Sequence, residues 1–171
     1  MKPRILSDER GVAAVEFALI AGVLAMAMLN GLDIARYLYQ RMEVQNASQM
    51  GAQSAWNTCD VAKLPASVNC PDLTTAVTSA VQSTSLGTAV TLKTGSPAEG
   101  YYCLNGSNAI VYVSNVSTKP ADCSSAGNAT AKPTDYIKIE TSFAYAPLFG
   151  GLSVGSTLPT PITAMSLMRL Q

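Results

Sequence analysis

Glu16 is the residue whose chemistry most needs an explanation, because it is the only charged residue in an apolar run from Val12 to Leu32. As a helix, this run would extend about 30 Å, which is the thickness of the hydrocarbon core of a bilayer. A carboxylate inside such a segment costs about 2.5 to 3.5 kcal/mol on insertion scales, so a partner or a function is expected for it. We therefore predict a membrane-spanning segment in which Glu16 makes a specific contact.

The composition argues against an enzyme. The chain of 171 residues has no histidine, which excludes His-based acid/base catalysis, Ser-His-Asp and Cys-His nucleophiles, and most zinc or haem sites. We therefore expect no catalytic residues, no metal and no cofactor. With 11 Lys+Arg against 11 Asp+Glu, the neutral chain gives no electrostatic reason to expect a nucleic-acid partner.

The four cysteines all follow the apolar run, at Cys59, Cys70, Cys103 and Cys123. None has the C-x-x-C spacing of a metal or redox site, so we expect disulfides in an oxidising compartment. Of the three possible connectivities, Cys59 with Cys70 and Cys103 with Cys123 closes the shortest loops, each contributing about 3 kcal/mol. The basic residues before the run favour a cytoplasmic N-terminus, so the cysteines would lie on the outer side.

Helical character continues beyond Leu32. From Asp33 to Trp56 there is no proline and only one glycine. We predict one helix over residues 12–57 that spans the membrane at 12–32, with Trp56 in the core of the next domain. The alternative is two separate helices, with a break near Asn30, Gly31 and Asp33. The predicted packing face of the outer half consists of Ile34, Leu38, Met42, Val44, Ala47, Met50, Ala52 and Ala55.

The remainder, residues 58–171, is predicted to form an exported, disulfide-stapled α+β domain. Leu73 to Thr84 has the periodicity of a second helix. Four later segments alternate with period two and are separated by Gly, Pro, Asn and Ser, which predicts an antiparallel sheet with both helices on one face. These segments are 88–94, 109–116, 136–145 and 162–170, with loops at 119–133 and 145–155.

The string from Arg10 to Ile20 (RGVAAVEFALI), with Asp33-Ile34-Ala35-Arg36-Tyr37-Leu38-Tyr39 after it, resembles TadE-like minor pilins or pseudopilins of tight-adherence (Flp-type) type IV pili. The resemblance implies a type IV pilin-like fold and a leader at 1–11. It also implies cleavage by a prepilin peptidase between Gly11 and Val12, with Glu16 and Phe17 as the acidic and aromatic positions used in assembly. The implied partners are other pilin subunits, an inner-membrane assembly platform and the lipid bilayer.

Cleavage after Gly11 would give Glu16 a partner. The new ammonium of Val12 in one subunit could meet the Glu16 carboxylate of its neighbour inside the membrane, which relieves two buried charges at once. The expected location is the bacterial inner membrane, with the N-terminus inside and the C-terminus outside, and afterwards the pilus at the cell surface.

Other interpretations remain open. An ordinary signal peptide could be cut at Ala25-Met26-Ala27, although a glutamate in its apolar region argues against it. An uncleaved signal-anchored protein that binds a surface is a second alternative. A pilus-tip adhesin is a third, and an exposed patch formed by Tyr101, Tyr102 or Phe149 would favour it.

Overall fold

The structure is a computed structural model that describes residues 9–171, so most of the predicted leader 1–11 lies outside the described residues. Its first element is α1 (Glu9–Thr58), a helix of 50 residues. The helix continues through Asn30, Gly31 and Asp33, so the alternative of two separate helices is wrong. The side chains of Asn30 and Asp33 form hydrogen bonds that leave the helix uninterrupted, as described below.

The chain forms two compact units, and α1 contributes to both. The helix-loop unit comprises described residues up to Tyr39 together with Tyr145–Pro159, and the sheet unit comprises Gln40–Ala144 and Thr160–Gln171. The sheet unit also holds α2 (Ala66–Asn69) and α3 (Leu73–Val81). The α+β class, with a long helix packed on an antiparallel sheet, is therefore confirmed.

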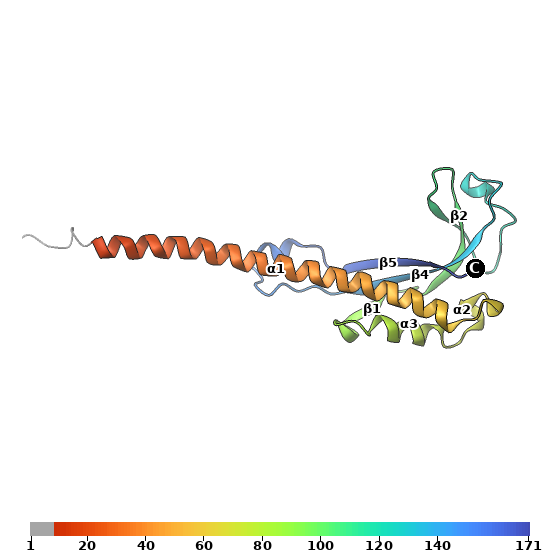
Figure 1. Cartoon of the computed structure of the whole chain (residues 1–171), viewed down its shortest axis with the longest axis horizontal. Coiled ribbons are helices and arrows are strands. Elements are labelled where there is room, and N and C mark those ends of the chain that lie inside the picture. Colours follow the sequence, from red (N-terminus) through yellow and green to blue (C-terminus); the bar gives the residue numbers. More distant parts are fainter. Residues whose placement is uncertain (1–8) are drawn as a thin grey trace, which may run out of the picture. The chain divides into compact units, whose positions relative to one another are not determined.

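The sheet is entirely antiparallel and has β4 at its centre. Strand β5 pairs along one side of β4, and β2 and β1 pair with successive parts of its other side. Strand β3 pairs with β2 at the far edge. The long strands β4 and β5 run beside each other in Figure 1. The strands are β1 (Val90–Leu92), β2 (Ala98–Leu104), β3 (Ile110–Asn115), β4 (Thr134–Phe143) and β5 (Ile162–Arg169).

Sequence periodicity finds four of these strands and misses β2. Four consecutive residues of β2, Gly100 to Cys103, are buried, so the strand lacks the alternation that reveals a half-exposed strand. Its pairing with β3 also shifts between Tyr101 and Tyr102, where the two strands form a bulge. Gly100 allows the Tyr112 ring of β3 to lie against the backbone, since a Cβ there would be 2.7 Å from that ring.

The core of the sheet unit lies between strand β4 and two helices, α3 and the C-terminal half of α1. The two helices run side by side in Figure 1. Ile137 and Ile139 of β4 and Val77 and Val81 of α3 are fully buried. Gly51 lies where the three elements meet, and a Cβ on it would be 2.8 Å from Val81 Cγ2 and 3.1 Å from Ile139 Cγ2. Small side chains on α1 therefore let the helix approach closely.

This close packing corrects the predicted face of α1 in part: its smaller members Val44, Ala47, Ala52 and Ala55 are buried as predicted. The largest apolar residues of that face, Ile34, Leu38, Met42 and Met50, are exposed, and Trp56 is 53% exposed rather than a core residue. The helix instead buries a stripe of mostly small side chains, because bulky ones would hold it away from the sheet. The members of this stripe in the sheet unit are Val44, Ala47, Ser48, Gly51, Ala52 and Ala55.

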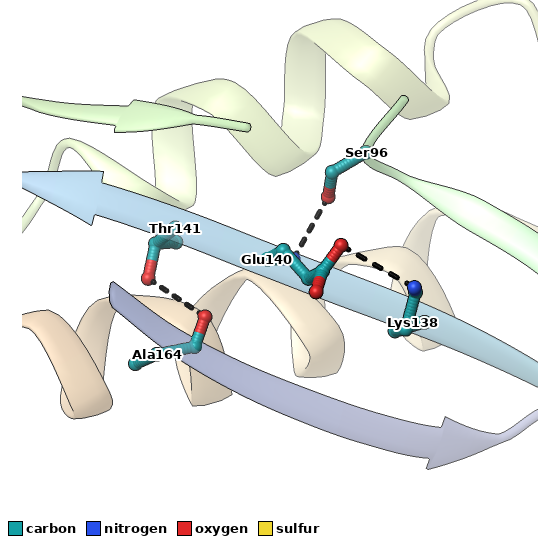
Figure 2. A network of polar contacts seen from close by, with 5 residues as sticks. All are labelled: Ser96, Lys138, Glu140, Thr141 and Ala164. Carbon is teal, nitrogen blue, oxygen red and sulfur yellow. Dashed lines mark hydrogen bonds and ion pairs between the residues drawn. The ribbon is translucent and has the colours of Figure 1, made fainter. Parts of the chain in front are cut away.

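Side chains on and around β4 form a network of polar contacts, which Figure 2 shows. The Glu140 N–H donates to Ser96 Oγ at 2.9 Å, and the Glu140 carboxylate pairs with Lys138 Nζ at 3.3 Å. Thr141 is fully buried, and its hydroxyl lies 3.2 Å from Val44 O of α1 and 3.5 Å from Ala164 O of β5. One hydroxyl thus connects the helix, the central strand and the neighbouring strand.

Two disulfides staple the sheet unit. Cys59 is bonded to Cys70 with their Cα atoms 5.9 Å apart, and Cys103 to Cys123 at 5.6 Å. The first bridge closes the turn after α1, which contains α2. The second ties the end of β2 to the loop before β4. This is the sequential pairing that the spacing favours.

Candidate functional site

The residues singled out by the sequence at the N-terminus lie on the first turns of α1. Gly11, Val12, Glu16 and Phe17 are all exposed, with Val12 at 67% and Phe17 at 74%. Val12 and Glu16 are four residues apart, so they lie on the same helix face, one turn from each other. The chain itself leaves this region uncovered, as expected of a segment that meets lipid or other subunits.

Within the described residues, α1 is the helix that is long and apolar enough to cross a membrane. The most apolar stretch of α1 is not buried by the rest of the chain. A core helix of a soluble domain would have that stretch covered, so the uncovered stretch indicates a segment for a membrane or for secretion.

A second group of polar residues lies where the apolar run ends, and Asp33 is its centre. Asp33 is fully buried. Its carboxylate accepts the N–H of Leu148 at 2.9 Å and of Phe149 at 3.3 Å, and it also accepts the hydroxyl of Ser153. The carboxylate therefore binds three donors from one loop, which we call the clamp loop (Tyr145–Pro159).

Two residues on neighbouring turns of α1 add to this contact. One turn before Asp33, Asn30 Oδ1 accepts the Val154 N–H at 2.7 Å. Its amide nitrogen donates to Met26 O at 2.7 Å, back along the helix. One turn after Asp33, Arg36 Nη1 donates to Ala146 O at 3.4 Å. Both ends of the clamp loop are thus hydrogen-bonded to the same helix.

Aromatic packing and a glycine complete the geometry. The rings of Tyr37 and Tyr145 meet edge to face with centroids 5.0 Å apart, and burial raises the pKa of the Tyr145 hydroxyl above its ordinary value. Gly155 is buried, and a Cβ on it would lie 2.8 Å from Asp33 Oδ2. Only glycine therefore leaves room for the carboxylate beside this part of the loop.

This arrangement supports binding within the chain rather than catalysis. The Asp33 carboxylate is closed to solvent and is occupied by donors of the clamp loop. Ser153 donates to Asp33 and accepts the Gly155 N–H at 3.1 Å, so its hydroxyl is engaged in contacts that order the loop. Among residues 9–171, no group of three or more His, Cys, Asp or Glu is placed to hold a metal ion.

Sequence reasoning did not find this cluster. The sequence singled out Asn30 and Asp33 as residues that could interrupt a helix, and Asp33 also as the start of the string Asp33 to Tyr39 that resembles TadE-like proteins. Two features of the sequence could have indicated the role of Asp33. Asp33 directly follows an apolar run, and the clamp loop has no charged residue and several glycines. A lone carboxylate next to a membrane needs donors, and exposed backbone N–H groups of a Gly-rich loop can supply them.

The sheet unit holds a different buried carboxyl group, Asp135, which is 4% exposed. Burial, followed by the negative charge of Glu99, raises the pKa of Asp135 to about 7. Glu99 itself accepts the N–H groups of Ala66 at 2.8 Å and Ser67 at 2.6 Å, at the start of α2. Lys119 partly offsets the negative charge at Asp135.

Residues 11–53 match the family model described as TadE-like protein. This stretch of the chain is therefore similar to TadE-like proteins. The family is associated with the biogenesis of Tad pili. The match contains Gly11, Val12, Glu16 and Phe17 as well as the helix side of the clamp, and it leaves residues 54–171 outside. No curated protein and no solved structure matches the chain.

The tyrosine patch that would favour a tip adhesin is not present. Tyr101 and Tyr102 are each only 9% exposed, and Phe149 is half-buried. Tyr102 instead packs edge to face against Tyr112 and Tyr136, with centroids 5.4 and 5.5 Å apart. These aromatic side chains contribute to the packing of the sheet unit.

Proposed function

We propose that this TadE-like protein is a minor pilin or pseudopilin that takes part in the assembly, initiation or tip of a tight-adherence type IV pilus. The observation that carries the proposal is the uncovered apolar half of α1, which contains Glu16 and lies within the family match. A subunit of a helical-bundle filament needs such a helix, because neighbouring subunits supply the cover that its own chain does not.

In this proposal, a prepilin peptidase cleaves between Gly11 and Val12. Residues 1–11 are then the leader, 12–57 the long helix with its span at 12–32, and 58–171 the exported domain. Gly11 has open space around it, since a Cβ added to it would have nothing within 4 Å. A small residue without packing partners suits a scissile position, because the local helix can unwind into a protease at little cost.

Glu16 then serves in assembly. The ammonium created at Val12 of one subunit pairs with the Glu16 carboxylate of a neighbour, inside the bilayer or the filament. Pairing offsets the cost of placing either charge in an apolar medium. A subunit packed in an incorrect register would leave a charge unpaired there, which disfavours that register. The disulfides support an outer location of the sheet unit, since such bonds persist in oxidising compartments.

The decisive experiment is intact-mass measurement and N-terminal sequencing of the protein extracted from membranes of a cell that has the pilus system. We expect a mature chain that begins at Val12. Gly11→Leu should leave the protein inserted but uncleaved. A chain that retains Met1, or one that begins at Met28 after cleavage behind Ala27, would contradict the prepilin interpretation and support an uncleaved anchor or an ordinary signal peptide.

A further inference from the structure

The clamp loop has a surface that neither the proposed assembly contact nor the Asp33 cluster uses. Leu148, Leu152 and Val154 are 58%, 65% and 48% exposed. The whole segment 145–159 contains no Asp, Glu, Lys, Arg or His. An uncharged surface segment with exposed aliphatic side chains is unusual for a loop in water, where polar side chains prevail.

The backbone polar groups around these aliphatic side chains are largely satisfied within the helix-loop unit. The Leu148 and Val154 N–H groups donate to Asp33 and Asn30 on α1. The Leu152 and Ser153 N–H groups donate to Phe149 O at 3.0 and 3.1 Å. Internal pairing of backbone groups is what an apolar medium requires, because unpaired N–H groups are costly to remove from water.

The hydrogen bonds from α1 to the clamp loop place this surface beside the end of the apolar run of the helix. Asn30 lies within the apolar run, and Asp33 and Arg36 follow it within two turns. A segment held against these residues lies where α1 leaves the hydrocarbon core. Arg36 is suited to the same level, since arginine side chains at the ends of spanning helices extend to the headgroups.

We infer that the clamp loop is a membrane-interface anchor, with Leu148, Leu152 and Val154 inserted among the lipids of the outer leaflet of the bilayer that α1 spans. The apolar surface of α1 and that of the loop would then form one continuous lipid contact. Interfacial segments of this kind reach about 5 to 10 Å into the boundary between headgroups and acyl chains. This inference rests on the proposed membrane span of α1.

The test uses the full-length chain in phosphatidylcholine vesicles at a low protein-to-lipid ratio, so that lipid is the main neighbour. The native Trp56 is replaced by Phe, and a single tryptophan is introduced as Leu152→Trp or, in a second variant, Leu148→Trp. Phe17→Trp reports on the span. Val68→Trp is the matched control, because Val68 is 69% exposed but belongs to the sheet unit.

Tryptophan emission is measured with and without lipids brominated near the top of the acyl chain. We expect Leu152→Trp and Leu148→Trp to emit at shorter wavelength than Val68→Trp and to lose more emission to bromine than that control. Quenching of Phe17→Trp alone, with the loop variants behaving like Val68→Trp, would overturn the inference while leaving the span intact. A blue-shifted but unquenched loop would also overturn it, since protein rather than lipid would cover the surface. Failure to quench Phe17→Trp would overturn the span and the anchor together.

Discussion

At the scale of single residues, Asp33 makes more contacts within the chain than Glu16, although both carboxylates belong to the same long helix and flank or lie in its apolar run. Glu16 is exposed on α1, so its partner must come from elsewhere. Asp33 is fully buried and has three donors in the clamp loop. Under the proposed function, the two residues separate two requirements of a membrane-anchored subunit, a contact with neighbours for Glu16 and a contact that orders its own loop for Asp33.

Removing the Asp33 carboxylate should release the clamp loop. Asp33→Ala leaves the Leu148 and Phe149 N–H groups without an acceptor, so their amide hydrogens should exchange with solvent much faster. Asp33→Asn keeps one acceptor oxygen and should have a smaller effect. Hydrogen exchange measured by mass spectrometry on the full chain in detergent checks this. Ser156→Ala is the control, because its hydroxyl donates to Ser153 O instead, and equal exchange in all variants would argue against the clamp.

Asp135 should make stability depend on pH. Its folded-state pKa is raised to about 7, whereas an unfolded aspartate titrates near 4. The folded chain therefore holds a proton that the unfolded chain has released, and the free energy of unfolding should fall as pH rises from about 4 to about 7, by a few kcal/mol in order of magnitude. Denaturant unfolding at pH 5 and pH 8 measures this difference.

The control for that prediction is a carboxyl group shifted the other way. Hydrogen bonding from Ser124 lowers the pKa of Asp122, so Asp122→Asn should leave the fall between pH 5 and pH 8 in place. Asp135→Asn should flatten it, because the amide cannot release a proton. A fall of equal size in Asp135→Asn would assign the pH dependence to other groups.

At the scale of elements, a helix or strand could be predicted from the sequence when its apolar and polar residues alternate regularly. The continuous helix α1 and the strands β3, β4 and β5 were predictable, because their apolar and polar residues follow periods of 3.6 and two. The buried face of α1 was predictable in part: Ala47 and the other small residues of the predicted face are buried, whereas Leu38 and Met42, which hydrophobicity also selects, are exposed. Gly51 was missed, because its role depends on its small size. Strand β2 lacked a period because of its bulge, and the Asp33 cluster depends on partners that are distant in sequence.

Gly51 tests the claim that size determines this packing face. Gly51→Leu should destabilise the sheet unit by about 1 to 3 kcal/mol or more, because its side chain must displace Val81 and Ile139. Gly51→Ala should cost less, since the gain in helix propensity of about 1 kcal/mol offsets part of the overlap. Gly31→Ala is the matched control, with nothing within 4 Å of its Cβ position. Thermal unfolding in detergent compares them, and a neutral Gly51→Leu would contradict the proposed close approach.

At the scale of the whole molecule, the sheet unit has its own core and disulfides, so its folding should not need Glu16. Glu16→Gln keeps the shape of the side chain but removes the charge that the Val12 ammonium of a neighbour would meet. The variant should accumulate in the inner membrane, cleaved and oxidised, while the number of pili falls. Immunoblots of membrane fractions and counts of pili by electron microscopy measure the two effects.

The matched variant for this experiment is Val15→Gln, which adds the same amide to the apolar run but retains Glu16. It should assemble better than Glu16→Gln if the charge matters more than polarity. Normal pili with Glu16→Gln would show that this carboxylate is not the assembly contact. Degraded protein would instead give Glu16 a role in stability.

The clamp would also set an order of events during the proposed biogenesis. Asp33 and its donors at Leu148, Phe149 and Ser153 are separated by 115, 116 and 120 positions. In the proposed topology, a chain that emerges N-terminus first would export Asp33 long before its partners, and the carboxylate would remain in water or be held by another protein until then. Loops of this length close slowly compared with local helix formation. Closure of the clamp would thus be a late step that marks a fully translocated subunit, and a chain stalled before Tyr145 would be distinguishable by its unoccupied Asp33.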